Sequence, residues 1–134
     1  MCTALRYLHM DKRVVHRDLS PKNIMITRDM QVKIADFGLA KQRESQSSGF
    51  LKSFVGTVLY SCPEIVQNLP YNEKADIWSL GCILYELSTL KQPFSAENPL
   101  TLARKIVEED YDVMDDEEFT PLLRTVVRKC MTAD

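Results

Sequence analysis

The chain has 134 residues, a length that supports one folded domain rather than two. Apolar residues make up 45% and charged residues 27% of it, as in ordinary soluble globular domains. A net charge of -2 gives no basic excess for binding nucleic acid or an anionic membrane surface. There is no apolar run of the ~20 residues that a membrane span needs and no signal peptide, so the cytoplasm is the default location, with the nucleus left open.

Cysteine and histidine are too sparse to indicate a disulfide framework or a zinc site. The four cysteines are far apart and form no Cys-x-x-Cys pair: Cys2, Cys62, Cys82 and Cys130. The two histidines, His9 and His16, lie close together in the sequence. This distribution favours a reducing compartment.

The first part of the chain alternates short apolar and polar stretches. Residues 5–9 have the apolar spacing that closes an amphipathic helix, and a polar loop over 16–23 follows. Apolar runs at 24–26 and 31–35 predict two short strands, and residues 27–30 between them predict a hairpin turn. This region is therefore expected to be a helix end, a loop and a β-hairpin.

The second part is expected to be helical after a polar loop. Residues 41–52 are polar and serine-rich, which is typical of a mobile surface loop. A helix is expected from Lys74, and its apolar residues leave few polar faces, which predicts a buried central position. These residues are Ile77, Trp78, Leu80, Gly81, Ile83, Leu84 and Leu87. Two further helices are expected over 100–107 and 121–131, with the acidic residues 108–118 as a solvated linker rather than a binding site.

Four motifs along the chain carry chemistry. They are His16-Arg17-Asp18-Leu19-Ser20-Pro21-Lys22-Asn23, then Asp36-Phe37-Gly38, Cys62-Pro63-Glu64 and Asp76-Ile77-Trp78-Ser79-Leu80-Gly81. In this order and at these separations they resemble four parts of a eukaryotic protein kinase: the catalytic loop, the metal-binding loop, the end of the activation segment and the central helix. The resemblance covers essentially the whole chain.

The resemblance implies a mainly α fold, that of a protein-kinase C-terminal lobe. A short β-hairpin would carry the catalytic and metal-binding loops, and the N-terminal lobe would be missing. Residues 1–134 would then form one partial protein kinase domain. Its catalytic loop would span 16–23, its activation segment 36–64 and its helical remainder 65–134.

The residue types in these motifs suit phosphoryl transfer, in which positioning and charge neutralisation dominate. The resemblance implies that Asp18 accepts the proton of the substrate hydroxyl. It also implies that Asn23 and Asp36 supply oxygen ligands for Mg²⁺ bound with ATP, and Mg²⁺ prefers such ligands. An isolated Asp or Asn in a loop would be read as a turn or cap residue. The ordered motifs favour the catalytic interpretation.

Other motif residues have structural roles in the family pattern. His16 is expected to pack against Phe37 rather than to act as a base, and Gly38 completes the same motif. Met25 corresponds to the residue beneath the adenine ring of ATP. The alternative for Met25, a core residue of a strand, describes the same contact without nucleotide.

Two acidic residues have both a local and a family interpretation. Asp76 stands at the start of a buried helix and is read as a simple N-cap, as the residue that holds the backbone of the catalytic loop, or as both. Glu64 pairs in the family with an arginine near the end of the kinase domain. No obvious counterpart precedes Asp134, and an unpaired buried carboxylate is costly.

The segment before Thr57 predicts a regulatory site. Arg17 precedes Asp18, the arrangement found in kinases that loop phosphorylation switches on. Ser53 lies four residues before Thr57, which matches the usual primary phosphosite, and Thr57 itself has a structural role. The hypothesis is that phospho-Ser53 pairs with Arg17 and Lys41 through charge-assisted hydrogen bonds. The alternative is that Ser53 is merely a polar loop residue.

Further stretches narrow the resemblance to one kinase family. The stretch Lys52-Ser53-Phe54-Val55-Gly56-Thr57 resembles the activation loop of the NIMA-related kinases. Three others most resemble the branch formed by that family's divergent tenth member: Ser61-Cys62-Pro63-Glu64, Tyr71-Asn72-Glu73-Lys74-Ala75-Asp76 and Gly81-Cys82-Ile83-Leu84-Tyr85. The implied activity is transfer of the ATP γ-phosphate to serine or threonine of protein substrates.

One position departs from the serine/threonine pattern. Such kinases carry lysine two residues after the catalytic aspartate, but this position is Ser20, and the lysine stands at Lys22. Tyrosine kinases also place their basic residue four positions after the aspartate, whereas Thr57 after Gly56 points back to serine/threonine specificity. Lys22 is therefore expected to contact the transferring phosphate, and tyrosine is left open as a second acceptor.

The chain lacks the Gly-rich loop, the strand lysine and the glutamate of the smaller lobe, so by itself it is expected to be inactive. Two interpretations remain open. The chain is a piece of a working kinase, or it is a truncated, inactive product that acts only by protein interaction. Intact Asp18, Asn23 and Asp36 favour the first and argue against a pseudokinase. Protein substrates and ATP are the expected partners, without nucleic acid or membrane.

Overall fold

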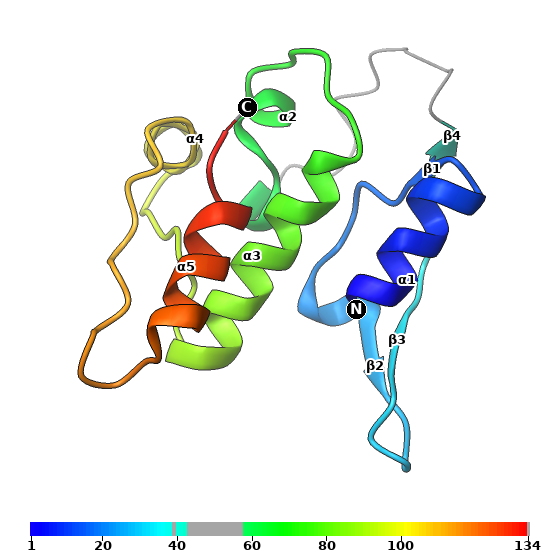
Figure 1. Ribbon diagram of the computed structural model, residues 1–134. Coiled ribbons are helices and arrows are strands. Elements are labelled where there is room, and N and C mark those ends of the chain that lie inside the picture. The colour runs from blue at the N-terminus through cyan, green and yellow to red at the C-terminus, as the bar shows by residue number, and fades with distance from the viewer. Residues whose placement is uncertain (39, 43–57, 134) are drawn as a thin grey trace.

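The structure is a computed structural model that describes residues 1–38, 40–42 and 58–133. Within them the helices are α1 (Cys2–Arg6), α2 (Pro63–Val66), α3 (Lys74–Thr89), α4 (Pro99–Val107) and α5 (Pro121–Cys130) (Figure 1). Strand β1 (Val14–Val15) pairs with β4 (Lys41–Gln42), and β2 (Ile24–Ile26) pairs with β3 (Val32–Ile34), both antiparallel. The mainly α class with a short β-hairpin, predicted from the sequence, is confirmed.

The first helix is longer than the sequence pattern indicated. Helix α1 continues as a π-helix over Tyr7–Asp11, in which the amide of Lys12 donates to the carbonyl of Tyr7 at 3.1 Å. Leu5 and His9 are its buried residues. Because they are four positions apart, they share one face of the helix. This face brings a histidine, and not only apolar side chains, to the interior.

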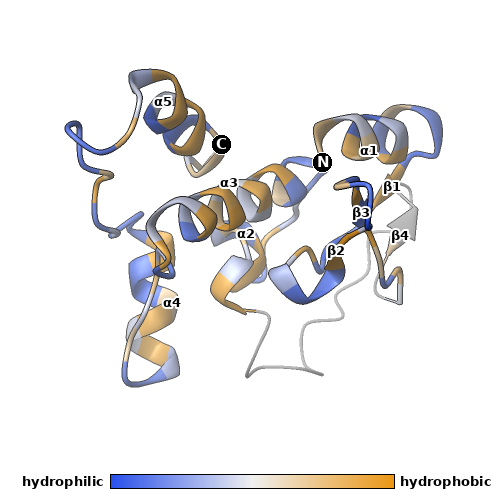
Figure 2. Ribbon diagram, turned by 90° about the horizontal axis from the view of Figure 1, so that it is seen from below, coloured by the Kyte–Doolittle hydropathy of each residue, from blue (hydrophilic) through white to orange (hydrophobic). Residues whose placement is uncertain are grey.

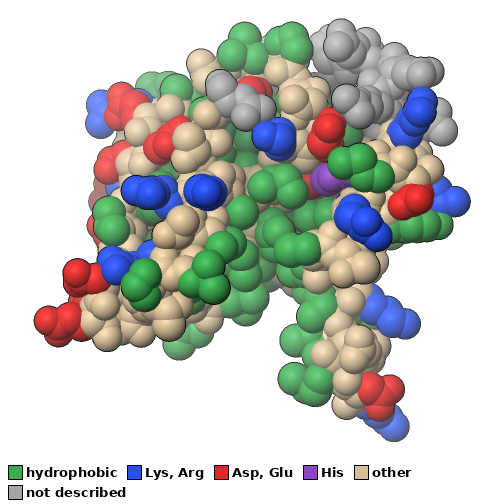
Figure 3. All heavy atoms as spheres, viewed as in Figure 1, with side chains coloured by type: hydrophobic (Ala, Val, Ile, Leu, Met, Phe, Trp, Pro, Cys, Tyr) green, Lys and Arg blue, Asp and Glu red, His purple; other side chains and the backbone are tan. Residues whose placement is uncertain are grey.

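The strand pair β2–β3 is the hairpin that the sequence predicted. Its register pairs Ile24 with Ile34 and Ile26 with Val32. Met30 takes a left-handed φ of 58° in the turn, and its amide donates to the carbonyl of Thr27 at 3.0 Å. The hairpin projects from the helical body (Figure 1) and carries exposed apolar side chains on its surface (Figure 3). These are Met25, Ile26, Met30 and Val32.

Helix α3 forms the centre of the core, as expected, and Figure 2 shows apolar residues along much of its length. Leu87 is the exception, because 66% of its surface is exposed and the predicted burial is wrong there. It continues the face of Leu80 and Ile83, since residues four and seven positions apart share a side of a helix. However, it lies in the last turn of α3, which ends at Thr89.

Helices α3 and α5 come closest at Gly81. A Cβ atom at this position would lie 2.7 Å from Cβ of Cys130 and 2.7 Å from Cγ of Met131. Any side chain would therefore force the two helices apart. Alanine is favoured over glycine by about 1 kcal/mol in a helix interior, but overpacking of this kind costs about 1–3 kcal/mol. The close contact explains why the middle of a buried helix contains a glycine.

The last two helices begin where the sequence provides start signals. Pro99 and Pro121 each occupy the first turn, and the residue before each proline caps the helix. Oδ1 of Asn98 accepts from the amide of Thr101 at 2.9 Å. Oγ1 of Thr120 accepts from the amide of Leu123 at 3.4 Å. These caps satisfy backbone amides that have no partner inside the helix.

An aromatic cluster holds the irregular segments against α3. The ring of Trp78 stacks on Phe94 at 5.9 Å, and Phe94 meets Tyr111 edge to face at 5.6 Å. Tyr111 and the buried Met114 belong to the acidic segment 108–118, in which no regular element was expected or is found. Most acidic residues of this linker are exposed, but Tyr111 and Met114 anchor it to the core and the half-buried Glu109 accepts from the Ala133 amide at 2.7 Å.

All four cysteines lie among the described residues, and none of them forms a disulfide. Burial and the neighbouring Glu64 carboxylate raise the pKa of the Cys62 thiol to about 12, and burial also raises the pKa of Cys82. Both therefore stay protonated at neutral pH and act as small apolar groups. Within the described residues no three His, Cys, Asp or Glu side chains gather as a metal site. Nor does this part of the chain contain a helix long and apolar enough to cross a membrane.

Candidate active site

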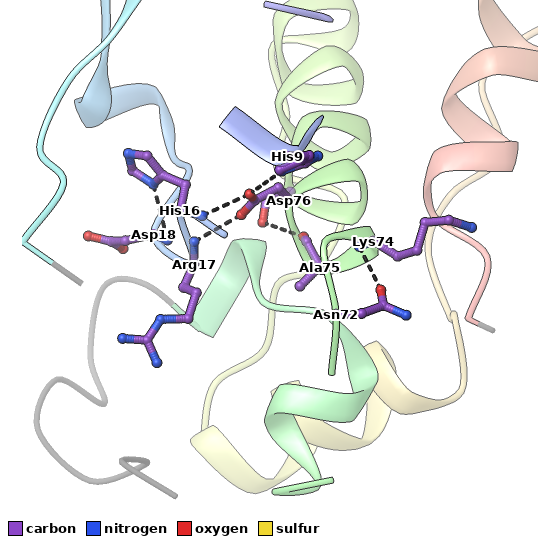
Figure 4. A network of polar contacts seen from close by, with 9 residues as sticks. His9, His16, Arg17, Asp18, Asn72, Lys74, Ala75 and Asp76 are labelled. Atoms are coloured by element: carbon purple, nitrogen blue, oxygen red, sulfur yellow. Dashed lines mark hydrogen bonds and ion pairs between the residues drawn. The ribbon is translucent and has the colours of Figure 1, made fainter. Parts of the chain in front are cut away.

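The carboxylate of Asp76 joins the π-helix Tyr7–Asp11, α3 and the loop that begins at His16 (Figure 4). Its Oδ2 atom accepts from the His16 amide at 2.9 Å and from Nε2 of His9 at 2.7 Å. Its Oδ1 atom accepts from the Arg17 amide at 2.9 Å. Asp76 is fully buried, and the N-cap of α3 is Glu73. The simple N-cap interpretation of Asp76 is therefore wrong, because its side chain binds the loop instead of its own helix.

These bonds hold an unusual backbone conformation just before Asp18. Arg17 has a φ of 69°, in the left-handed region, which costs a residue with a side chain about 1–2 kcal/mol. The hydrogen bonds from two consecutive amides to Asp76 offset that cost, because charge-assisted hydrogen bonds are stronger than those between neutral groups. The chain turns here, and the half-buried Asp18 follows directly.

Asn23 fixes the other end of the same loop. Its Nδ2 group donates to the Asp18 carbonyl at 2.7 Å and lies 3.2 Å from Oδ2 of the Asp18 carboxylate. A carbonyl oxygen accepts only from a donor, so this contact sets the orientation of the Asn23 amide. The oxygen Oδ1 of Asn23 is then left as an acceptor for a ligand.

The β-hairpin brings Asp36 beside Asn23. Ile24 and Ile34 are paired, so the residues just outside this pair also lie opposite each other, and the Ala35 amide donates to the Asn23 carbonyl at 2.8 Å. Asp36 comes next, with a left-handed φ of 59°, and its Oδ1 accepts from the Gly38 amide at 3.0 Å. A Cβ atom at Gly38 would lie 3.0 Å from that same oxygen, so glycine gives the carboxylate room.

The donor set formed by Asn23 and Asp36 fits Mg²⁺. Mg²⁺ is usually held by one or two protein oxygens together with water and substrate phosphates, and not by a complete cage of side chains. Asn23 offers an amide oxygen whose orientation is fixed. Asp36 is exposed and uses only one of its two oxygens in the hydrogen bond to Gly38. An incomplete set of two oxygens beside open solvent is the arrangement that such a site requires.

His16 is part of the support of the site. Its Nε2 donates to the Ala35 carbonyl at 3.1 Å, and its Nδ1 faces the Asp18 amide at 3.4 Å. Its ring contacts that of Phe37 edge to face, with centroids 5.0 Å apart. The side chain is completely buried and both its nitrogens face backbone groups. This environment leaves no free nitrogen to act as a base.

The remaining sequence-predicted residues fall into two groups. Lys22 and Met25 are exposed, on the 3₁₀ turn Pro21–Asn23 and on β2. The backbone of Lys41 pairs with Val15, next to His16, so β4 runs beside the start of the catalytic loop. The side chain of Lys41 and the whole of Ser53 and Thr57 lie outside the described residues.

Glu64 lines a cavity of about 230 Å³ together with Tyr71, Lys74 and Trp78. Within the described residues no basic side chain pairs with it. Its carboxylate lies near the Cys62 thiol, as the raised pKa of that thiol reflects. The cost of a buried carboxylate without a partner is reduced here because Glu64 is only half-buried.

Sequence reasoning missed two tyrosines near the site. The Tyr60 hydroxyl donates to Glu86 at 2.7 Å, and burial together with this carboxylate raises the Tyr60 pKa. The hydroxyl of Ser79 donates to the Tyr60 carbonyl at 2.7 Å, which ties the residues before α2 to α3. The Tyr71 hydroxyl accepts from Nη1 of Arg17 at 2.9 Å. No sequence signal pairs Arg17 with Tyr71, since they are 54 positions apart.

Comparison with known proteins finds the same family by two routes. A family model described as protein kinase domain matches residues 1–134. Serine/threonine-protein kinase Nek10 of Mus musculus is 50% identical over 134 residues, and Nek10 of Homo sapiens is 49% identical over the same length. A serine/threonine-protein kinase of Caenorhabditis elegans is 54% identical over 134 residues. All three alignments cover 100% of this chain, which spans only 11% to 13% of the length of these relatives. The resemblance to the tenth NIMA-related kinase is confirmed.

The role of Asp76 leads to a stability prediction. Asp76→Ala leaves two buried amides and the His9 side chain without their acceptor, so the free energy of unfolding should fall by about 3–5 kcal/mol. Chemical denaturation of the purified protein measures this change. Asn72→Ala is the matched control, because Asn72 also accepts from a backbone amide beside α3, that of Lys74 at 2.7 Å, but at an exposed position. Its cost should be about 1 kcal/mol. Equal losses in the two variants would contradict the role of Asp76.

Proposed function

The chain belongs to the protein kinase domain family, and from that membership we propose that it carries the catalytic centre of an ATP-dependent protein serine/threonine kinase. The observation that supports this most is that Asn23 contacts Asp18 and lies opposite Ala35, the residue before Asp36. Asp18, Asn23 and Asp36 come from two separate motifs, and the register of β2–β3 places Asn23 beside the residue that precedes Asp36. The family uses ATP with Mg²⁺, and the exposed oxygens at this site suit that pair.

In this proposal each residue has one task. Asp18 accepts the proton of the substrate hydroxyl as its oxygen attacks the γ-phosphorus of ATP. Asn23 and Asp36 would hold Mg²⁺, which supplies positive charge to the phosphate oxygens when it is bound. Met25, with 59% of its surface exposed on β2, offers an apolar surface for the adenine ring. Asp76 acts only through the loop that it holds.

The proton-accepting role of Asp18 is tested by Asp18→Asn in the complete protein. The amide keeps the size of the side chain but cannot accept the proton at neutral pH, so kcat should fall about 10²–10⁴-fold. A radiometric peptide assay measures kcat, and thermal unfolding should show an unchanged midpoint. Asp29→Asn, an exposed aspartate in the hairpin turn, is the control and should keep full activity. A fully active Asp18→Asn variant would refute the assignment.

We propose Lys22 as the side chain that contacts the transferring phosphate, with serine and threonine as main acceptors and tyrosine as a second one. The burial of Ser20 supports this proposal: 6% of its surface is exposed, so this position points into the protein. Lys22, two residues later, is exposed on the 3₁₀ turn and is free to reach outward.

Lys22→Ala should lower kcat about 10²-fold or more, because it removes a positive charge from the transition state. Lys33→Ala is the control, since Lys33 is an exposed lysine on the neighbouring strand. Matched serine, threonine and tyrosine peptides should all be phosphorylated by the complete protein, the tyrosine peptide more slowly. A tyrosine peptide that stays unmodified would remove the second acceptor from the proposal.

We also propose that phosphorylation of Ser53 activates the enzyme through Arg17 and Lys41. Support comes from Arg17, whose backbone is fixed beside Asp18 while its guanidinium reaches outward. Ser53→Ala should lower activity about tenfold or more, the value of one lost charge-assisted hydrogen bond. Ser45→Ala, in the same serine-rich stretch, should have no effect. If the Ser53→Ala protein were fully active, the regulatory role would be excluded.

A further inference from the structure

Tyr71 lies in the segment between α2 and α3, where it belongs to no helix or strand. Its hydroxyl accepts from Nη1 of Arg17 at 2.9 Å, and 38% of its surface is exposed. The segment is tied at both ends. The Leu69 amide donates to the Glu64 carbonyl at 2.7 Å, and the Lys74 amide donates to Oδ1 of Asn72 at 2.7 Å. The phenol is therefore held beside the arginine by an anchored loop.

Arg17 is anchored equally well on the other side of this contact. Asp76 binds its backbone amide at 2.9 Å, and the left-handed φ of 69° sets the direction in which the side chain leaves the loop. A guanidinium in this position offers several N–H groups in one plane. A neutral phenol oxygen accepts one N–H bond from it, whereas a phosphate can accept two parallel N–H bonds from a guanidinium.

We propose that Tyr71 is a phosphorylation site and that Arg17 binds its phosphate. In the modifying step a protein tyrosine kinase transfers the γ-phosphoryl group of ATP to Oη of Tyr71. The bond between the γ-phosphorus and the bridging oxygen breaks, the bond from phosphorus to Oη forms, ADP leaves, and the phenol proton passes to that kinase's base. The cavity of about 230 Å³ that Tyr71 borders gives the ring space to move back as the phosphate takes the place of the hydroxyl.

The modification changes a weak contact into a strong one. Phosphotyrosine carries about −1.5 to −2 charges at neutral pH and adds three acceptor oxygens, so it holds a guanidinium far more firmly than a phenol does. Arg17 then stays bound to phospho-Tyr71 in the segment between α2 and α3. This consequence rests on the proposed function: an arginine that binds phospho-Tyr71 is withdrawn from phospho-Ser53. Phosphorylation of Tyr71 therefore opposes activation.

The pairing is tested without any kinase assay. The complete protein is produced with phosphotyrosine incorporated at position 71, and its phosphate is titrated by ³¹P NMR. Pairing with Arg17 should lower the second pKa of that phosphate by about one unit relative to the same protein with Arg17→Gln. Phosphotyrosine at position 7 is the control, since Tyr7 is also exposed but lies on the π-helix. Its titration should not respond to Arg17→Gln. Equal pKa values at position 71 with and without Arg17 would overturn the proposal.

A kinase assay then tests the regulatory consequence separately. Protein with phosphoserine at 53 and phosphotyrosine at 71 should be at least about tenfold less active than protein with phosphoserine alone. Unchanged activity together with a shifted phosphate pKa would remove the inhibitory role and keep the binding role. If the unmodified complete protein phosphorylated nothing, the proposed function would fail, but the NMR titration would still decide the pairing.

Mass spectrometry tests whether Tyr71 is phosphorylated in cells. No lysine or arginine lies between Ser53 and Lys74, so trypsin releases both phosphorylation sites on one peptide, residues 53–74. Complete protein isolated from cells treated with vanadate, which blocks tyrosine phosphatases, should yield this peptide with phosphate on Tyr71. Consistent absence of that species, with the unmodified peptide well detected, would refute the assignment of Tyr71 as a modification site.

Discussion

The position of the loop over 16–23, the proposed catalytic loop, depends on one buried carboxylate. Moving an ionised side chain from water into the protein interior costs several kcal/mol unless its oxygens are fully used. Asp76 meets this condition with two consecutive backbone amides of the loop and with His9 from the preceding helix. The requirement acts in both directions. The backbone amides of the loop donate to the Asp76 carboxylate, and the carboxylate in turn stabilises the strained backbone conformation of Arg17 just before Asp18. Loop, π-helix and α3 are thereby combined into one unit.

The second requirement of the site is met by strand register. Asn23 and Asp36 belong to different motifs, and a hairpin of only three paired positions places Asn23 opposite Ala35, the residue before Asp36. A change of register by one residue would move Ala35, and Asp36 after it, out of line with Asn23. Paired strands define such a geometry more sharply than a free loop, which suits the proposed metal site with its few protein ligands.

Much of this arrangement can be predicted from the sequence, because its signals are local. The capped prolines mark where α4 and α5 begin, and the ordered motifs give Asp18, Asn23 and Asp36 as candidate site residues. Contacts between segments that are far apart in the sequence cannot be predicted from such local signals. The pairing of β1 with β4 involves two residues on each side, too few for a pattern. The exposure of Leu87 depends on which other elements cover its face. The bond between Arg17 and Tyr71 depends on how the chain folds back and not on either motif.

The glycine contact between α3 and α5 has a mechanical consequence. Because Cβ of Cys130 and Cγ of Met131 occupy the space in which a side chain at Gly81 would begin, the two segments pack there without a gap. The carboxylate of Asp76, which binds the loop at His16 and Arg17, belongs to the same helix as Gly81. A larger side chain at Gly81 would therefore push α5 away from the helix that positions this loop.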